Sequence, residues 1–112
     1  MKLSKETEAK IIELQTFEQN LNNFAMQKQR FQITQTEIEN AIEELKKTKE
    51  DAYKIIGSIM IKSKKEDLEK DLNEKKEIID LRIKNIEKQE NKIKEKASEL
   101  QKEVMSKIEN EK

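Results

Sequence analysis

The chain reads Tyr-Lys-Ile-Ile-Gly-Ser-Ile-Met-Ile-Lys-Ser from Tyr53 to Ser63, and this stretch decides how the rest of the chain folds. It contains the only glycine among 112 residues, and the chain has no proline. Two short runs rich in β-branched residues flank Gly57-Ser58, and a glycine at the first central position supplies the positive φ of a type II′ turn. The pattern predicts a β-hairpin at about residues 52–62, with Ile56 opposite Ile59 and Ile55 opposite Met60.

The predicted hairpin carries large apolar side chains on both of its faces. A lone two-stranded ribbon is marginally stable in water and leaves two edges without hydrogen-bond partners. We therefore expect these strands to complete a sheet with strands of other chains. The hairpin predicts an oligomer.

The residues before the hairpin are spaced as in a coiled-coil helix. Apolar residues from Leu14 to Leu45 recur at alternating steps of three and four, with Lys28 and Gln35 filling two places of the seam. Ser4 is expected to cap the start of this helix. The first helix is predicted at about residues 5–49, and we interpret Lys28 and Gln35 as polar residues that set its register rather than as ligands.

The residues after the hairpin predict a second helix of similar length, at about residues 64–110. The segment Ser63–Glu66 matches a capping box, with the serine at the N-cap and the glutamate three residues later. Apolar residues then recur every seven positions from Leu72 to Leu100, and Lys76 and Glu90 interrupt the second row of the seam.

A hairpin between two helices of equal length turns the chain back on itself. The predicted fold class is therefore all-α dominated (α+β), a long antiparallel two-helix coiled coil with a single β-hairpin between the helices. We expect residues 1–112 to form one domain, with the hairpin at one end of the arm and both termini at the other.

Composition and charge exclude several classes of protein. Charged residues make up 43% of the chain and apolar residues 33%, which is too little apolar surface for a compact globule. The 24 basic and 24 acidic residues balance and are interleaved, so neither nucleic acid nor an anionic membrane is an expected partner. The chain shows no bilayer-spanning apolar run and no secretory signal, and we expect it to be cytoplasmic.

The chain is also poor in the residues that carry chemistry. It has no histidine and no cysteine, which removes the usual general base and the ligands of zinc, haem and iron–sulfur sites. Its one glycine cannot build a phosphate-cradling loop. Acidic pairs such as Asp67/Asp71 are interpreted as solvated helix faces. We therefore predict that the protein is not an enzyme, holds no cofactor or metal, and acts through its surface.

The apolar set near the two termini is wider than a two-helix seam can cover. Ile11 and Ile12 accompany Leu14 on the first helix, and Met105 and Ile108 accompany Val104 on the second. Two interpretations remain open. These residues either thicken the seam or pack against a neighbouring arm, or they form an adaptable surface that binds other apolar surfaces.

Several short motifs carry a resemblance to a known family. They are Gln27-Lys28-Gln29 in the first helix, Asp51-Ala52-Tyr53-Lys54 with Gly57 and Ile59-Met60-Ile61 in the hairpin, and Leu81-Arg82 with Ile86-Glu87-Lys88-Gln89-Glu90 in the second helix. On these residues the chain resembles the β-type subunits of archaeal prefoldin over nearly its whole length. The hairpin motif Tyr-Lys-x-x-Gly-x-Ile is the most specific of them.

The resemblance implies a hexamer of two α-type and four β-type subunits whose hairpins assemble into intersubunit β-barrels. It further implies an ATP-independent holdase that binds non-native polypeptides at the arm tips and passes them to a group II chaperonin. Oligomerisation would fall to Tyr53, Ile55, Ile56, Gly57, Ile59, Met60 and Ile61. Client binding would fall to Ile11, Ile12, Leu14, Val104, Met105 and Ile108. A proline-containing segment before the first helix, present in many members, is absent here.

A structural coiled-coil spacer or adaptor is the alternative from a different class. Such a protein would dimerise in parallel and use the middle segment as a hinge within a continuous rod. Gly57 and the capping box at Ser63 count against it, because a continuous rod would keep helix through that region.

Overall fold

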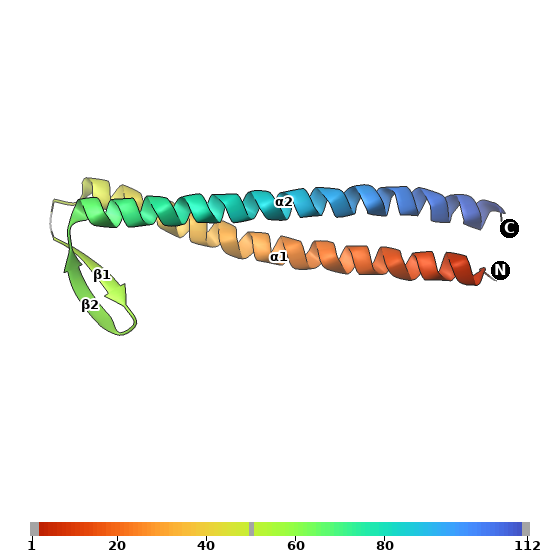
Figure 1. Ribbon diagram of the computed structural model, residues 1–112, viewed down its shortest axis with the longest axis horizontal. Helices are drawn as coiled ribbons and strands as arrows, with labels where there is room; N and C mark the ends of the chain where they lie inside the picture. The colour runs from red at the N-terminus through yellow and green to blue at the C-terminus, as the bar shows by residue number, and fades with distance from the viewer. Residues whose placement is uncertain (1–2, 50, 111–112) are drawn as a thin grey trace. The chain divides into compact units, whose positions relative to one another are not determined.

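The computed structural model describes residues 3–49 and 51–110. Helix α1 (Lys5–Lys47) is followed by strand β1 (Ala52–Ile56), strand β2 (Ile59–Ser63) and helix α2 (Lys65–Asn110) (Figure 1). The predicted fold class, two long helices with an antiparallel hairpin between them, is confirmed. The described residues fall into two compact units, each combining part of α1 with part of α2. The terminal unit comprises residues 3–28 and 85–110, and the hairpin unit comprises residues 29–49 and 51–84.

Helix α1 begins directly after Ser4, as predicted. The backbone N–H of Thr7 donates to Ser4 Oγ at 3.1 Å, and the N–H of Glu8 donates to the Ser4 carbonyl at 3.0 Å. Ser4 therefore occupies the N-cap and satisfies a backbone donor that the helix itself leaves without a partner. Glu6 and Glu8 lie in the first turn, where the positive end of the helix dipole stabilises carboxylates.

Helix α2 begins one residue later than the capping box implied. Ser63 is the last residue of β2 and pairs with Ala52, and the Lys64 carbonyl accepts the first helical hydrogen bond, from the Leu68 N–H at 3.1 Å. Lys64 is thus the N-cap, and the prediction of Ser63 at that position is wrong. The physical reason is that the strand ladder extends through Ser63 and keeps its backbone in the sheet.

The hairpin has the predicted register and turn. Ile56 pairs with Ile59 and Ile55 pairs with Met60, so two residues connect the strands. Gly57 has a φ of 61°, and no other described residue has a positive φ, which fits a type II′ turn rather than a type I′ turn. A Cβ at Gly57 would meet no atom within 4 Å, so the backbone conformation alone demands glycine here. The alternative of a continuous helix through this segment is wrong.

The hairpin unit has an antiparallel helix pair with a narrow apolar seam. Gln35 Nε2 donates to Asp80 Oδ1 at 2.6 Å, and Glu39 Oε1 lies 3.6 Å from Lys76 Nζ. The residue number falls on α2 as it rises on α1, which is the antiparallel sense. The buried apolar side chains of this unit are Ile38, Ile42, Leu68 and Ile83. Burial of such a side chain contributes roughly 1.5–3 kcal/mol.

The terminal unit is built in the same way. Ile86 and Val104 are buried, and Phe17 and Phe24 are half-buried at the seam positions that the heptad spacing predicted. Ion pairs join Glu6 to Lys107 and Lys10 to Glu103, again in antiparallel sense. Neither helix, over the part of the chain that the structure describes, is both long and apolar enough to cross a membrane.

Candidate assembly and client surfaces

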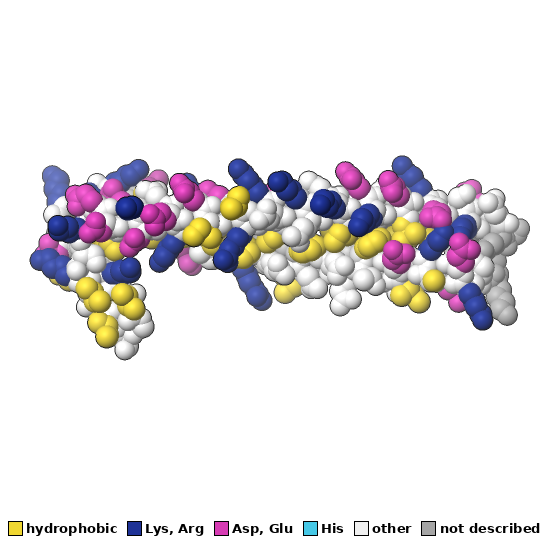
Figure 2. Space-filling model, in the orientation of Figure 1, with side chains coloured by type: hydrophobic (Ala, Val, Ile, Leu, Met, Phe, Trp, Pro, Cys, Tyr) yellow, Lys and Arg dark blue, Asp and Glu magenta, His cyan; other side chains and the backbone are white. Residues whose placement is uncertain are grey.

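The hairpin exposes nearly all of its apolar side chains. Between 45% and 68% of the residue surface is accessible at Tyr53, Ile55, Ile56, Ile59, Met60 and Ile61. Because side chains alternate along a strand, Ile55 and Met60 lie on one face while Ile56 and Ile59 lie on the other. Figure 2 shows these apolar side chains gathered over the hairpin. Two apolar faces and two unpaired strand edges make this hairpin a surface suited to pairing with further strands.

The base of the hairpin is held against the helices of its own unit. Lys54 Nζ lies 3.3 Å from Asp71 Oδ2 of α2, and both side chains are about two-fifths exposed. Tyr53 lines a cavity of about 270 Å³ whose apolar wall includes Leu45 and Leu72. The base of the hairpin therefore contacts α2 of its own unit through this ion pair.

The six residues with a predicted client-binding role divide into three classes of exposure. Ile12 is 62% exposed and Met105 is 55% exposed. Ile11, Leu14 and Ile108 are half-buried, and Val104 is only 4% exposed. All six lie in the terminal unit. In this conformation Ile12 and Met105 offer the accessible surface, and Val104 packs in the seam.

A network of ion pairs crosses between the helices of the terminal unit. Lys10 contacts both Glu6, at 3.4 Å, and Glu103, and Lys107 also contacts Glu6. The hydrogen bonds from Lys107 and Lys10 lower the pKa of Glu6, and the hydrogen bond to Glu103 raises the pKa of Lys10. These ion pairs join the two helices at the surface of the terminal unit, where water screens their attraction.

The polar interruptions of the seam are partners of one another. Lys28 Nζ donates to Glu90 Oε1 at 2.8 Å, and the Glu90 side chain is only 8% exposed. This hydrogen bond raises the pKa of Lys28 despite the partial burial of the amine. The sequence pattern marks both residues as interruptions of the seam but does not pair them. The available signal was their opposite charge at seam positions of two antiparallel helices.

Further apolar residues are exposed away from the predicted sites. Met26 and Ile33 of α1 are 56% and 54% exposed, and Ile78 and Leu81 of α2 are 52% and 61% exposed. Met26 and Ile33 stand one heptad apart, fourteen and twenty-one residues after Ile12. The seam pattern masked this second row, because each of its members lies outside the a and d positions. Among the described residues, no three or more acidic, histidine or cysteine side chains gather as metal ligands would.

Comparisons with known proteins agree with one another. The family model described as Prefoldin subunit matches residues 8–111. A protein named Prefoldin subunit beta from Archaeoglobus fulgidus is 36% identical over 98 residues, which are 86% of this chain and 84% of that protein. Its counterpart from Thermococcus kodakarensis is 32% identical, covering 90% and 88% of the two chains. The crystal structure of the prefoldin beta subunit from Thermococcus strain KS-1 superposes with a TM-score of 0.89 at 29% identity and covers 94% of each chain.

Proposed function

The chain belongs to the prefoldin subunit family and is of its β type, and from this premise we propose that it is an ATP-independent holdase subunit. Prefoldins are chaperone components rather than enzymes, and they assemble with other prefoldin subunits. The observation that supports the proposal best is the hairpin, whose apolar side chains stay exposed on both faces of a two-stranded ribbon. Such a surface is stable in water only when further strands cover it.

The proposed assembly is a hexamer of two α-type and four β-type subunits held together by intersubunit β-barrels. Tyr53, Ile55, Ile56, Ile59, Met60 and Ile61 would supply the apolar contacts, with Gly57 shaping the turn. Main-chain hydrogen bonds along the open strand edges would add affinity, and the alternating side chains would add specificity. Each subunit would act as one domain spanning residues 1–112.

The assembly is tested by placing charge on the hairpin. Replacing Ile59→Lys together with Ile61→Lys puts two ammonium groups where the strands must pair, and we expect the subunits to remain separate. Ile78→Lys with Leu81→Lys is the matched control, because it changes two residues of similar exposure on α2. Each variant is mixed with an α-type subunit and followed by sizing with light scattering. A complex of unchanged mass from the hairpin variant would refute the proposed interface.

The proposed client site is the apolar surface of the terminal unit. Non-native polypeptides expose apolar segments, and Ile12 and Met105 present exposed apolar side chains to them. The unbranched methionine can repack around different partners. Several weak sites held by one assembly bind a client by avidity without new contacts. Ile11, Leu14 and Ile108 would join as the half-buried margin, and Val104 would support the site from the seam.

The client site is tested on the assembled complex. We expect Ile12→Ser with Met105→Ser to impair suppression of client aggregation, measured by light scattering of a diluted denatured protein. Ile78→Ser with Leu81→Ser removes equally exposed apolar surface from α2 and should leave suppression intact. Val104→Ala should instead lower the melting temperature, because it opens a cavity in the seam. Full suppression by the Ile12 and Met105 variant would place client binding elsewhere.

The remaining steps of the proposed function concern the destination of the client. The holdase would act in the cytoplasm and pass its client to a group II chaperonin, and release would follow competition by the larger surface of that chaperonin. This transfer needs no nucleotide in the present chain. Mixing the client-loaded complex with a group II chaperonin and measuring recovered client activity tests it. Recovery that does not depend on the chaperonin would contradict the proposed transfer.

A further inference from the structure

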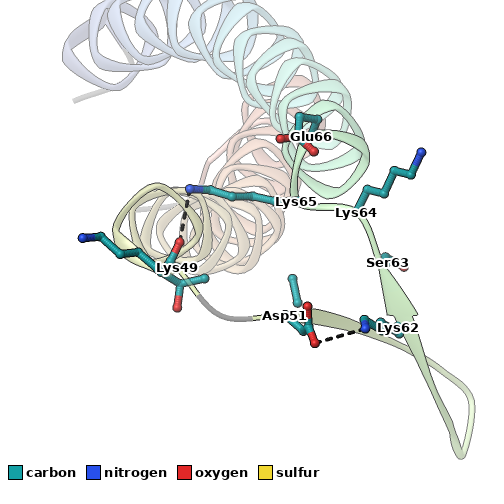
Figure 3. Close-up of a pocket in the computed structure, with 9 residues that line it drawn as sticks. Lys49, Asp51, Lys62, Ser63, Lys64, Lys65 and Glu66 are labelled. Carbon is teal, nitrogen blue, oxygen red and sulfur yellow. Dashed lines mark hydrogen bonds and ion pairs between the residues drawn. The ribbon is translucent and has the colours of Figure 1, made fainter.

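Two lysine-rich runs lie together where both helices join the hairpin. One run, at residues 46–49, ends α1, and the other, at residues 62–65, leads from β2 into α2. Between them lies a cavity of about 730 Å³ in the hairpin unit (Figure 3). Its charged lining residues are Lys49, Lys62, Lys64, Lys65, Asp51 and Glu66.

The charge of the chain is distributed unevenly although its total is zero. Residues 46–67 contain seven lysines and four acidic residues, whereas residues 1–45 contain eight acidic and five basic residues. Residues 68–112 are balanced. The junction of helices and hairpin is therefore the positive part of the chain, and it follows directly on an acidic part.

Two of the cavity lysines have structural partners and two do not. Lys62 Nζ lies 3.1 Å from Asp51 Oδ2, and Lys65 Nζ donates at 3.3 Å to the Thr48 carbonyl (Figure 3). Lys65 Nζ also donates at 3.3 Å to the Lys46 carbonyl, at the C-terminal end of α1. Lys49 and Lys64 are exposed and make no ion pair with any residue in 3–49 or 51–110.

Lys64 also conflicts with its local structure. It occupies the N-cap of α2, at the positive end of the helix dipole, where a carboxylate rather than an ammonium group is favoured. A lysine that opposes the local helix preference and has no partner within its own chain indicates a partner on another molecule.

An acidic counterpart lies on the same unit. Glu37, Glu43 and Glu44 are exposed on α1, and within the described part of the chain none of their carboxylates forms an ion pair. The last of them precedes the lysine run by a single residue, Leu45. A surface with opposite charges side by side is complementary to itself after a two-fold rotation.

We propose that the lysine cavity of one copy receives Glu43 and Glu44 of a second copy, and that the reverse contact forms at the same time. Lys49 and Lys64 would donate to the carboxylates, because their ammonium groups are accessible. The inference depends on the proposed function in one respect, because two copies of this chain must come together in the assembly. The hairpins would supply the affinity, and these charges would select the partner and its orientation. Nucleic acid is a poorer fit, since no arginine or aromatic side chain lines the cavity and Asp51 and Glu66 do.

Charge reversal on each side of the contact gives two variants with opposite behaviour. The acidic variant carries Lys49→Glu and Lys64→Glu, and the basic variant carries Glu43→Lys and Glu44→Lys. Each repels its own copies at both contacts, whereas the two attract one another at both. In an equimolar mixture at low ionic strength, native mass spectrometry should show a ratio of mixed dimers to like dimers that is about tenfold or more above the statistical ratio of about one. High salt should reduce that excess.

The control pair carries Lys88→Glu with Lys92→Glu, or Glu87→Lys with Glu95→Lys, on α2 of the terminal unit, and should mix statistically. Statistical mixing of the junction variants, or a wild-type chain that never self-associates, would overturn the inference. A third result would also overturn it. In that result the wild type binds a DNA oligonucleotide, the acidic variant does not, and the two junction variants mix statistically. A different result would contradict the proposed function. If the Ile59→Lys, Ile61→Lys variant still assembled, the hairpin interface would be wrong whatever the charge-reversal variants did. Circular dichroism verifies that each variant remains helical.

Discussion

The pair formed by Lys28 and Glu90 allows the most quantitative test of the coiled-coil seam. Replacing Lys28→Met keeps an unbranched apolar stem, removes the ammonium group and leaves the Glu90 carboxylate, which is 8% exposed, without its partner. Removing one member of a fully buried pair costs about 3–5 kcal/mol. Water reaches this pair because the Lys28 side chain is 27% exposed, so we expect about half of that loss, roughly 2 kcal/mol.

The assay is urea unfolding of the assembled protein, followed by far-ultraviolet circular dichroism at one fixed protein concentration. The double variant Lys28→Met, Glu90→Leu removes both charges and places apolar side chains in the seam, and it should recover most of the loss or exceed the wild type. Lys62→Met is the matched control, since both members of its pair with Asp51 are about two-thirds exposed and it should cost at most about 1 kcal/mol.

Two results would refute this reasoning. One is a double variant no more stable than Lys28→Met, and the other is a cost of Lys28→Met no greater than that of the Lys62→Met control. The pH dependence gives an independent check. The raised pKa of Lys28 means that its contribution is complete below the unfolded value, about 10.4, and is lost as the pH rises through the higher folded value.

Three further predictions address the other features. Gly57→Ala places a residue with a Cβ in the left-handed backbone conformation, at a cost of roughly 1–2 kcal/mol. Assembly measured by sedimentation should therefore weaken while the helical content stays the same. Unchanged assembly would argue against the role of the turn. Asp71→Lys should weaken assembly by loosening the hairpin from α2, and adding Lys54→Asp should restore it; a variant pair without mutual rescue would contradict the contact. The lowered pKa of Glu6 means that its stabilisation is present above about pH 4.3 and disappears as the pH falls through the lower folded value. The difference in melting temperature between wild type and Glu6→Gln should therefore shrink toward zero in acid, and a constant difference would contradict that ion pair.

Features that depend on near neighbours along the chain follow from the amino-acid sequence alone. A single glycine between two β-branched runs specifies the turn, since only its backbone adopts a φ of 61° without strain. The register followed, because a two-residue turn leaves one pairing of Ile56 with Ile59. Ser4 caps α1 through a contact three residues away, and the heptad spacing selects the seam face, for the same local reason.

Contacts between residues that are distant in the sequence depend instead on how the elements pack together. Lys28 and Glu90 are 62 positions apart, so their pairing depends on the axial alignment of the two helices. The spacing of residues within each helix does not specify that alignment. Ser63 pairs with Ala52 in the sheet, so Lys64 rather than Ser63 is the N-cap of α2. The fold around the hairpin also places two separate lysine runs at one cavity. The conformational preferences of neighbouring residues determine the helices and the hairpin of this protein, and the packing of one element on another determines which charged residues come into contact.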